Sequence, residues 1–340
     1  MRTIPAMEPQ STDQQLQQNA VLRFAGTRDL ESLEKSMSDA LGPRYADYRR
    51  AWHESSRSSN NIFPLHIDFE LNDTCNQSCI MCPRNTDTHV NTGYNLNTRK
   101  FFDLNDFQKV IDESVGYGLT SINLGAYAEP LIHPQFSDFV LYAKSKGILD
   151  IRIITNGLRL DDYATFLVDQ EVTNVYISLD ATTNETYTAI RGPGFERVKN
   201  NLIKLIDERN SRSALFPIIR ASFVKMKINE AEEPTFVNYW KSLVDHIDIQ
   251  PGEDLSHSTQ AVLSTPYRFN CISPWQRLSV LASGDIIPCC SFYGRYLSLG
   301  NISQISLSQA WNSDSMRQVR QDLSNGTQNI CEICQRSSLA

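Results

Sequence analysis

The sequence lacks the long apolar runs that would carry it through a membrane. No stretch of its 340 residues approaches the roughly 18 apolar residues that a membrane-spanning helix needs. The first residues, 1–7, also lack the apolar core of a signal peptide. These two absences predict a cytoplasmic protein with no membrane partner.

Positive charge is scarce as well. The chain has 32 lysines and arginines against 39 aspartates and glutamates, which gives a formal net charge of −7. Because a nucleic-acid binder presents a basic face, the balance argues against nucleic acid as a general partner. This charge balance does not exclude a local basic patch that would bind an acidic electron donor. The length and the 41% hydrophobic content are those of a globular protein with one large domain, or a large and a small one.

Cysteines are absent between Cys82 and Cys271, so the eight cysteines fall into two separate groups. Secreted disulfide scaffolds are short and dense in cysteine, which this chain is not. Two clumps of thiols separated by a long cysteine-free stretch predict two metal sites.

The first group is Cys75, Cys79 and Cys82, which follow an alternating segment at 65–71. One short loop can present these three thiolates to one point and leave a fourth position open. A structural zinc site closes its shell with four protein ligands, whereas an iron–sulfur cube held by three cysteines keeps one iron uncapped. A disulfide with a spare thiol, or a zinc knuckle with a distant ligand, are the alternatives. The absence of an obvious fourth Cys or His nearby favours iron–sulfur.

The spacing Cys75-x-x-x-Cys79-x-x-Cys82 resembles the cluster loop of the radical S-adenosylmethionine (radical SAM) enzymes. The resemblance implies a 4Fe-4S cluster whose open iron chelates the amine and carboxylate of S-adenosylmethionine. It also implies reductive cleavage of that cofactor to methionine and a 5′-deoxyadenosyl radical. The family usually has an aromatic residue before the third cysteine, where this chain has Met81, a polarisable apolar surface for the adenine.

Short apolar segments alternate with longer amphipathic ones from residue 65 onward. Strand candidates are 65–71, 121–124, 151–155, 175–179, 218–224 and 247–250. Helix candidates with apolar residues at helical spacing lie between them. This alternation predicts an α/β fold with a parallel sheet of right-handed βαβ units, and leaves a doubly wound sheet and a barrel as alternatives. The resemblance implies the partial (β/α)6 TIM-like barrel.

The segment before the barrel, residues 1–60, reads as a polar and helical lead-in. Its Gln-rich run at 10–18 is expected to fray. Residues 29–55 have a helical pattern that Gly42-Pro43 divides into two pieces. Such a lead-in packs on the next domain, or alternatively docks a partner or substrate.

Polar residues at the carboxyl ends of the strands are the candidate cofactor contacts, because chemistry gathers there in both architectures. Glu129, before Pro130, resembles the family's Gly-Gly-Glu-Pro segment that binds the cofactor's amine, although the small residues before it are altered. Arg191 is similar to the family arginine that pairs with the cofactor carboxylate. The remaining candidates are Asn156 in a turn and Ser178 and Asp180, which strand alternation points the same way.

Two weaker candidates, Arg220 and Gln250, end near the same mouth of the barrel. Alone, each of these polar residues reads equally well as a cap or a surface salt bridge.

The second cysteine group is Cys271, Cys289, Cys331 and Cys334. A hairpin signal at 283–285 lies between the first two, and a helix is expected from 306 to about 323. Spacing alone also suits a zinc ribbon. The pattern Cys-x12-Gly-x4-Cys with a terminal Cys-x-x-Cys resembles the SPASM/twitch extension of radical SAM enzymes, which implies one auxiliary 4Fe-4S cluster with four Cys ligands. The expected domains are therefore 61–255 for the barrel and 256–340 for the extension.

Cys290 is left over. Adjacent residues on a strand point oppositely, so Cys289 and Cys290 are not expected to share one cluster. Leftover cysteines are mostly buried small hydrophobes. The alternative is a hydrogen-atom donor to a substrate radical.

Together these features predict a radical SAM oxidoreductase that takes a hydrogen atom from a sugar- or aminocyclitol-like small molecule. The auxiliary cluster would accept an electron and make the outcome a net dehydrogenation. Alternatives are a peptide-modifying or epimerising radical SAM enzyme and, in another class, a non-catalytic iron–sulfur or zinc scaffold or electron carrier. A flavodoxin- or ferredoxin-type protein is the expected electron donor.

Overall fold

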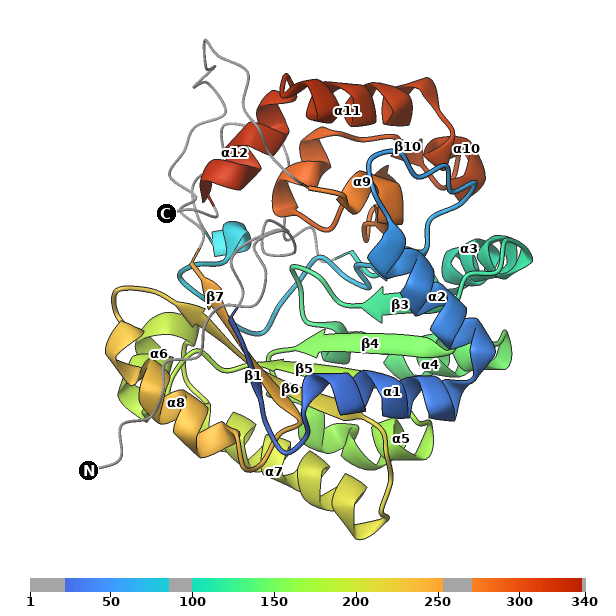
Figure 1. The fold of residues 1–340 in the computed structure, drawn as a ribbon. Helices are drawn as coiled ribbons and strands as arrows, with labels where there is room; N and C mark the ends of the chain where they lie inside the picture. Colours follow the sequence, from blue (N-terminus) through green and yellow to red (C-terminus); the bar gives the residue numbers. More distant parts are fainter. Residues whose placement is uncertain (1–21, 86–99, 253–270, 338–340) are drawn as a thin grey trace.

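The strands join into one sheet with the order β1-β7-β6-β5-β4-β3-β2-β8-β9-β10. We describe it in a computed structural model that covers residues 22–85, 100–252 and 271–337 (Figure 1). The Gln-rich run at 10–18 and the expected domain boundary at 255/256 lie outside the described residues. None of the described helices is long and apolar enough to cross a membrane.

The centre of the sheet consists of parallel neighbours that form the partial barrel, which confirms the expected fold. Each strand lies within two residues of its predicted range. These strands are β2 His66–Phe69, β3 Ser121–Leu124, β4 Asp150–Thr155, β5 Asn174–Ser178, β6 Ile218–Lys225 and β7 His246–Pro251.

The two faces of these strands differ in polarity. One face carries fully buried apolar residues, such as Ile67, Ile122 and Ile153, which pack into the main hydrophobic core. The alternate residues, including Asp68 and Arg152, line a cavity on the inner side. Because successive side chains of a strand point to opposite faces, this alternation separates an apolar shell from a polar lumen.

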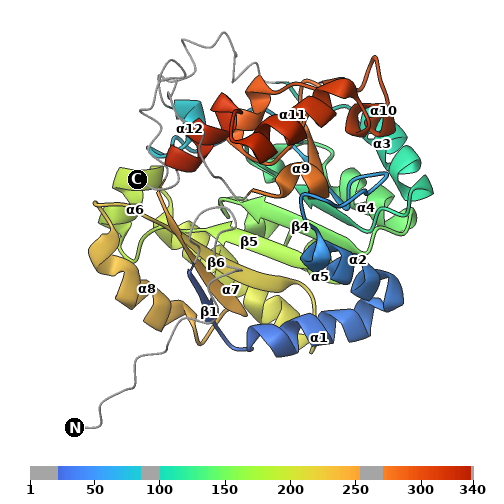
Figure 2. The same cartoon turned by 45° about the horizontal axis from the view of Figure 1, so that its top comes forward.

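Helices cover the apolar face of the sheet and connect successive strands (Figures 1 and 2). In α7, for example, Val198, Leu202 and Leu205 are fully buried at helical spacing. At the start of α3, the Asp103 side chain caps the helix by accepting hydrogen bonds from the amides of Asn105 and Asp106. The covering helices are α3 Leu104–Gly116, α4 Phe136–Ser145, α5 Ala164–Asp169, α6 Asn184–Arg191, α7 Phe195–Ser211 and α8 Glu233–Trp240.

The lead-in is built into the barrel. Strand β1 (Leu22–Ala25) pairs antiparallel with β7. Helices α1 (Leu30–Leu41) and α2 (Pro43–Glu54) separate at Gly42, which has a φ of 81°, as the Gly-Pro pair predicted. Their buried residues form a hydrophobic cluster with Phe216 and Ile218 of the β6 region. The lead-in therefore packs on the barrel and lines its lumen.

The C-terminal segment extends the barrel sheet rather than forming its own. The predicted hairpin exists between β8 (Arg277–Val280) and β9 (Asp285–Ile287), with Gly284 at a φ of 86°. However, β8 also pairs in parallel with β2, and β10 (Gly300–Asn301) continues from β9. The first strand of the hairpin, β8, is thus a neighbour of β2, the strand that precedes the first cysteine loop.

The helix expected from 306 to 323 was wrong as a single element. It is two helices, α10 (Leu307–Trp311) and α11 (Asp314–Asn325). The reason is a second N-cap at Ser313, whose hydroxyl accepts the amide of Met316 and starts α11 anew. Helix α12 (Asn329–Ser337) contains the cysteine pair, and α9 (Ser273–Gln276) follows Cys271.

Candidate cluster and cofactor site

The three cysteines of the first loop lie together just beyond the carboxyl end of β2. Burial and the neighbouring thiols raise the pKa of Cys79 to about 11, and Cys75 acts on both Cys79 and Cys82. The loop is fixed to α6, since the Ile80 amide donates to the Ile190 carbonyl at 2.9 Å. Buried thiols of this kind become ligands when a metal takes the proton's place, so the donor set fits an iron–sulfur cluster.

Two N–H donors reach the sulfurs of this loop. Asn156 Nδ2 lies 3.7 Å from Cys75 Sγ, and Arg191 Nη1 lies 3.7 Å from Cys79 Sγ. Hydrogen bonds to ligand sulfurs are one of the factors that set a cluster's reduction potential. The structure thus brings two of the predicted cofactor contacts to the cysteine loop itself.

The other partner of Arg191 is Asp180. Arg191 Nε donates to Asp180 Oδ2 at 2.7 Å, and both side chains are buried. Asp180 also accepts the Val224 amide at 2.6 Å. This arrangement aims the guanidinium at the cysteine loop by holding it from the opposite side.

The expectation that Ser178 and Asp180 point the same way rested on an extended strand. Strand β5 ends at Ser178, and Asp180 has a φ of 63°, in the left-handed region. The two-residue alternation therefore stops before Asp180. Ser178 stays half-buried at the end of the strand.

Glu129 is buried and bonded to the protein. Its carboxylate accepts hydrogen bonds from the Thr155 hydroxyl at 2.7 Å, the Asn156 amide at 2.7 Å and the Leu131 amide at 3.1 Å. Burial raises the pKa of Glu129 to about 7, against the opposing effect of these three donors. Glu129 thus anchors the turn that presents Asn156, while its contact with the cofactor's amine remains a prediction.

We expect Glu129→Gln to destabilise the protein. Glutamine offers one oxygen and one NH2 group, so one of the two buried backbone amides must face another donor, at a cost of about 2 kcal/mol. A drop of several degrees in the thermal unfolding midpoint would report this cost. Glu113→Gln is the matched control, because the Glu113 carboxylate also accepts two amides, those of Leu307 and Ser308, but is only part-buried. Equal midpoints for the two variants would contradict the anchoring role.

The second cysteine group also converges. Burial is the main cause that raises the pKa of Cys289 well above its usual range. The neighbouring Cys290 adds most to it, and Cys271, Cys334 and Cys331 add further. A Cβ at Gly294 would lie only 2.7 Å from Cys289 Sγ, so this glycine allows the backbone of the 3₁₀ helix η6 (Phe292–Tyr296) to approach the thiol.

Within the three described ranges, no three Cys, His, Asp or Glu side chains come close enough together to hold a single metal ion.

Cys289 and Cys290 have different surroundings. The first charges that act on the Cys290 thiol are those of Arg277 and Asp68, which lie on the inner face of the barrel. Its carbonyl accepts the Tyr127 hydroxyl at 3.3 Å. Cys290 therefore lies between the second cysteine group and the lumen.

A buried ion pair locks the two halves of the site together. Arg295 of η6 donates to Glu70, the residue after β2, and both side chains are at most 2% exposed. In both overall views, the 3₁₀ helix η1 (Pro83–Asn85), which follows the first cysteine loop, lies beside α12, which carries Cys331 and Cys334 (Figures 1 and 2). The two cysteine groups thus occupy the same end of the barrel.

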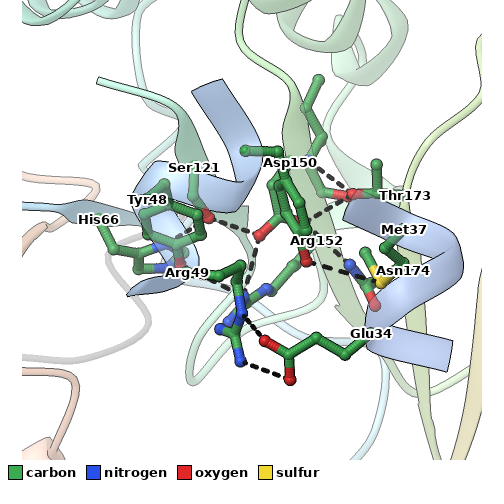
Figure 3. Close-up of polar contacts among 12 residues, drawn as sticks. Glu34, Met37, Tyr48, Arg49, His66, Ser121, Asp150, Arg152, Thr173 and Asn174 are labelled. Carbon is green, nitrogen blue, oxygen red and sulfur yellow. Dashed lines mark hydrogen bonds and ion pairs between the residues drawn. The ribbon is translucent and has the colours of Figure 1, made fainter. Parts of the chain in front are cut away.

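Below this end lies a lumen cavity of about 670 Å³. It reaches up to Ile154, two residues before Asn156. Figure 3 shows part of its wall with Arg152 and Asn174, which donate hydrogen bonds to Asp150 outside the lining; Asp150 also accepts one from Ser121. This wall was not predicted from the sequence, although Arg152 in an otherwise apolar strand was a signal for it.

Comparison with known families agrees with this geometry. The radical SAM superfamily model matches residues 69–219, and the model of the SPASM iron–sulfur cluster-binding domain matches residues 271–336. The chain belongs to the radical SAM enzymes, which use a 4Fe-4S cluster and S-adenosylmethionine. More particularly, it is a radical SAM enzyme with a C-terminal SPASM iron–sulfur domain.

Relatives of known name are distant. A probable GTP 3′,8-cyclase of Methanococcus maripaludis is 26% identical over 190 residues, which cover 54% of this chain and 59% of that protein. The mycofactocin maturase MftC of Mycobacterium tuberculosis is 30% identical over 175 residues, 51% of this chain and 41% of that protein. The chain therefore spans less than two thirds of these relatives.

Solved structures share the fold at low identity. BtrN in complex with AdoMet and 2-DOIA has a TM-score of 0.50 at 18% identity, covering 79% of this chain and 92% of that one. SuiB of Streptococcus suis bound to the precursor peptide SuiA has a TM-score of 0.57 at 15% identity, covering 79% and 71%. At these identities the likeness shows the partial barrel alone.

Proposed function

We propose that this enzyme dehydrogenates a small sugar- or cyclitol-like molecule, in a net two-electron oxidation. The observation that carries the proposal is a cavity of small-molecule size that reaches Ile154, near the turn whose Asn156 contacts Cys75, and Ile272, next to Cys271. When bound, the first cluster and S-adenosylmethionine supply a 5′-deoxyadenosyl radical, and the auxiliary cluster supplies an electron acceptor. An alcohol that loses a hydrogen atom from carbon, then one electron and the hydroxyl proton, becomes a carbonyl.

The residues of this chain have distinct roles in the proposal. The first cluster is held by Cys75, Cys79 and Cys82. The cofactor is oriented by polar residues at the strand ends, namely Glu129, Asn156, Ser178, Asp180 and Arg191. A single auxiliary 4Fe-4S cluster takes the second cysteine group, Cys271, Cys289, Cys331 and Cys334. The enzyme would work in the cytoplasm, with a flavodoxin- or ferredoxin-type electron donor.

Two alternatives within the same class have specific support. The position of Cys290 between the auxiliary group and the lumen suits a hydrogen-atom donor, and hence epimerisation. The likeness to SuiB, whose structure holds a precursor peptide, suits peptide modification. Against a peptide, α1 and α2 line the lumen and leave a cavity that suits a small molecule.

Turnover of a polyol panel under anaerobic reduction tests the proposal. Dehydrogenation predicts one carbonyl product for each 5′-deoxyadenosine, with no solvent deuterium at the reacting carbon. The Cys290→Ala variant should then keep its activity. If the product is not oxidised but carries solvent deuterium, and Cys290→Ala loses activity, the enzyme is an epimerase and the proposed dehydrogenation is wrong.

A further inference from the structure

The wall of the lumen is positively charged, in a chain whose net charge is −7. Two acidic residues, Glu34 and Asp68, line the cavity. Its arginines are Arg23, Arg49, Arg152, Arg220 and Arg277. Burial lowers the pKa of His246 to about 4 and also lowers that of His66, so these two lining histidines are neutral near pH 7. The third lining histidine, His53, bonds to Glu34 at 3.1 Å.

Each of the five arginines bonds to a carboxylate. Arg23 shares Asp248 with Arg220, and Arg49 bonds to Glu34. Arg152 bonds to Asp150 at 2.9 Å and Arg220 to Asp248 at 2.7 Å, and both aspartates are at most 1% exposed and lie outside the lining. Arg277 bonds to Asp68 at 3.3 Å. Even with the two hidden aspartates included, the five arginines outnumber four carboxylates.

Aromatic rings fix two of the guanidinium planes. The Arg220 guanidinium lies 3.5 Å from the centroid of Tyr176, and that of Arg277 lies 4.8 Å from the centroid of Trp52 on α2. Stacked guanidinium groups are well suited to planar recognition of carboxylate or phosphate.

Arg152, Arg220 and Arg277 each have one buried N–H donor, at Nε, without an acceptor among the residues that the structure describes. A buried N–H without an acceptor is costly, so three such donors on one wall fit a ligand that brings oxygen acceptors.

We propose that the lumen recognises an oxyanion, and that Arg152, Arg220 and Arg277 hold a carboxylate or phosphate group of the substrate. This inference rests on the proposed function for treating the lumen as the substrate site. It narrows the polyol to a sugar acid or a phosphate ester. An aminocyclitol is disfavoured, because its ammonium group would face a wall of arginines.

The geometry also orients the substrate. The arginines lie along the strands, while Ile154 lines the cavity near the turn of Asn156 and the first cysteine loop. An anionic group on the arginines therefore directs the rest of the molecule toward that loop. Binding energy from this remote group would position the reacting C–H bond.

One sugar ring with four charge states tests the inference. We would measure affinities of glucosamine, glucose, glucuronate and glucose 6-phosphate for the anaerobic holoenzyme with S-adenosylmethionine, by calorimetry without reductant. At least one anion should bind about tenfold more tightly than glucose, with glucosamine weakest. The comparison of glucuronate with glucose 6-phosphate distinguishes a carboxylate from a phosphate ester.

Variants distinguish the loss of anion binding in the lumen from general effects on the fold. Arg220→Gln and Arg277→Gln should each lower the anion affinity about tenfold and leave glucose unchanged, whereas Arg220→Lys keeps the charge and most of the preference. Arg209→Gln is the control, because Arg209 is a buried arginine paired with Asp245 outside the lumen lining. Thermal unfolding confirms that each variant folds.

Equal affinity for the four sugars, no binding of either anion, or anion binding that survives in both glutamine variants would overturn the inference. The measurement needs no turnover, so it is independent of the proposed oxidation. An anion preference without a carbonyl product would refute the dehydrogenation alone, and a carbonyl product from a neutral sugar would refute the oxyanion site alone.

Discussion

Replacing Cys75, Cys79 and Cys82 together by alanine should lower the iron content of the reconstituted protein from about eight to about four atoms per chain. The same variant should form no 5′-deoxyadenosine under reduction. The physical reason is that these three thiols lie together on one loop, so their loss removes one complete ligand set and leaves the C-terminal group intact. Iron and sulfide analysis after anaerobic reconstitution measures the change.

A single replacement gives the matched control. Cys290→Ala removes a thiol outside both proposed ligand sets and should retain about eight irons. An unchanged iron content in the triple variant would refute the assignment of the first loop. It would also leave the Asn156 and Arg191 contacts to sulfur without a role in setting a potential.

Much of the barrel could be predicted from the sequence because its strands are short and bounded by clear turn signals. Strand β3 (Ser121–Leu124) coincides with its predicted range, and Gly42 separates α1 from α2 as expected. The cysteine loop was equally predictable, since the spacing of ligands within one loop is a local property of the sequence. Local patterns carry such features without knowledge of the tertiary structure.

The pairing of strands that lie far apart in the sequence could not be predicted. The four residues of β1 and the parallel pairing of β8 with β2 depend on contacts across most of the chain. Asp180 shows the same limit at the site: its left-handed backbone and its pairing with Arg191 are tertiary outcomes that strand alternation did not foresee. The sequence offered Arg152 as a charged residue in an apolar strand, but only the closed sheet turns that residue into a lumen wall.

The second large effect concerns the auxiliary group. Cys331→Ala with Cys334→Ala should leave 5′-deoxyadenosine formation nearly unchanged and lower the carbonyl product at least about a hundredfold, a loss of roughly 3 kcal/mol in the barrier to product. Both residues lie on α12 and not on the loop proposed to hold the first cluster, so hydrogen abstraction should retain its ligands. What fails is removal of the electron from the substrate. Product and deoxyadenosine quantified in the same reaction measure this separation.

Gly294→Ala provides a milder version of the same test. Its added methyl group would press on Cys289 Sγ without removing any thiol, so the auxiliary site should lose iron while all eight cysteines remain. If both variants keep a full yield of carbonyl product, the electron leaves the substrate by another route and the auxiliary group is structural. If zinc instead of iron occupies the C-terminal group in the wild type, the same conclusion holds, because zinc has no redox chemistry to accept the electron.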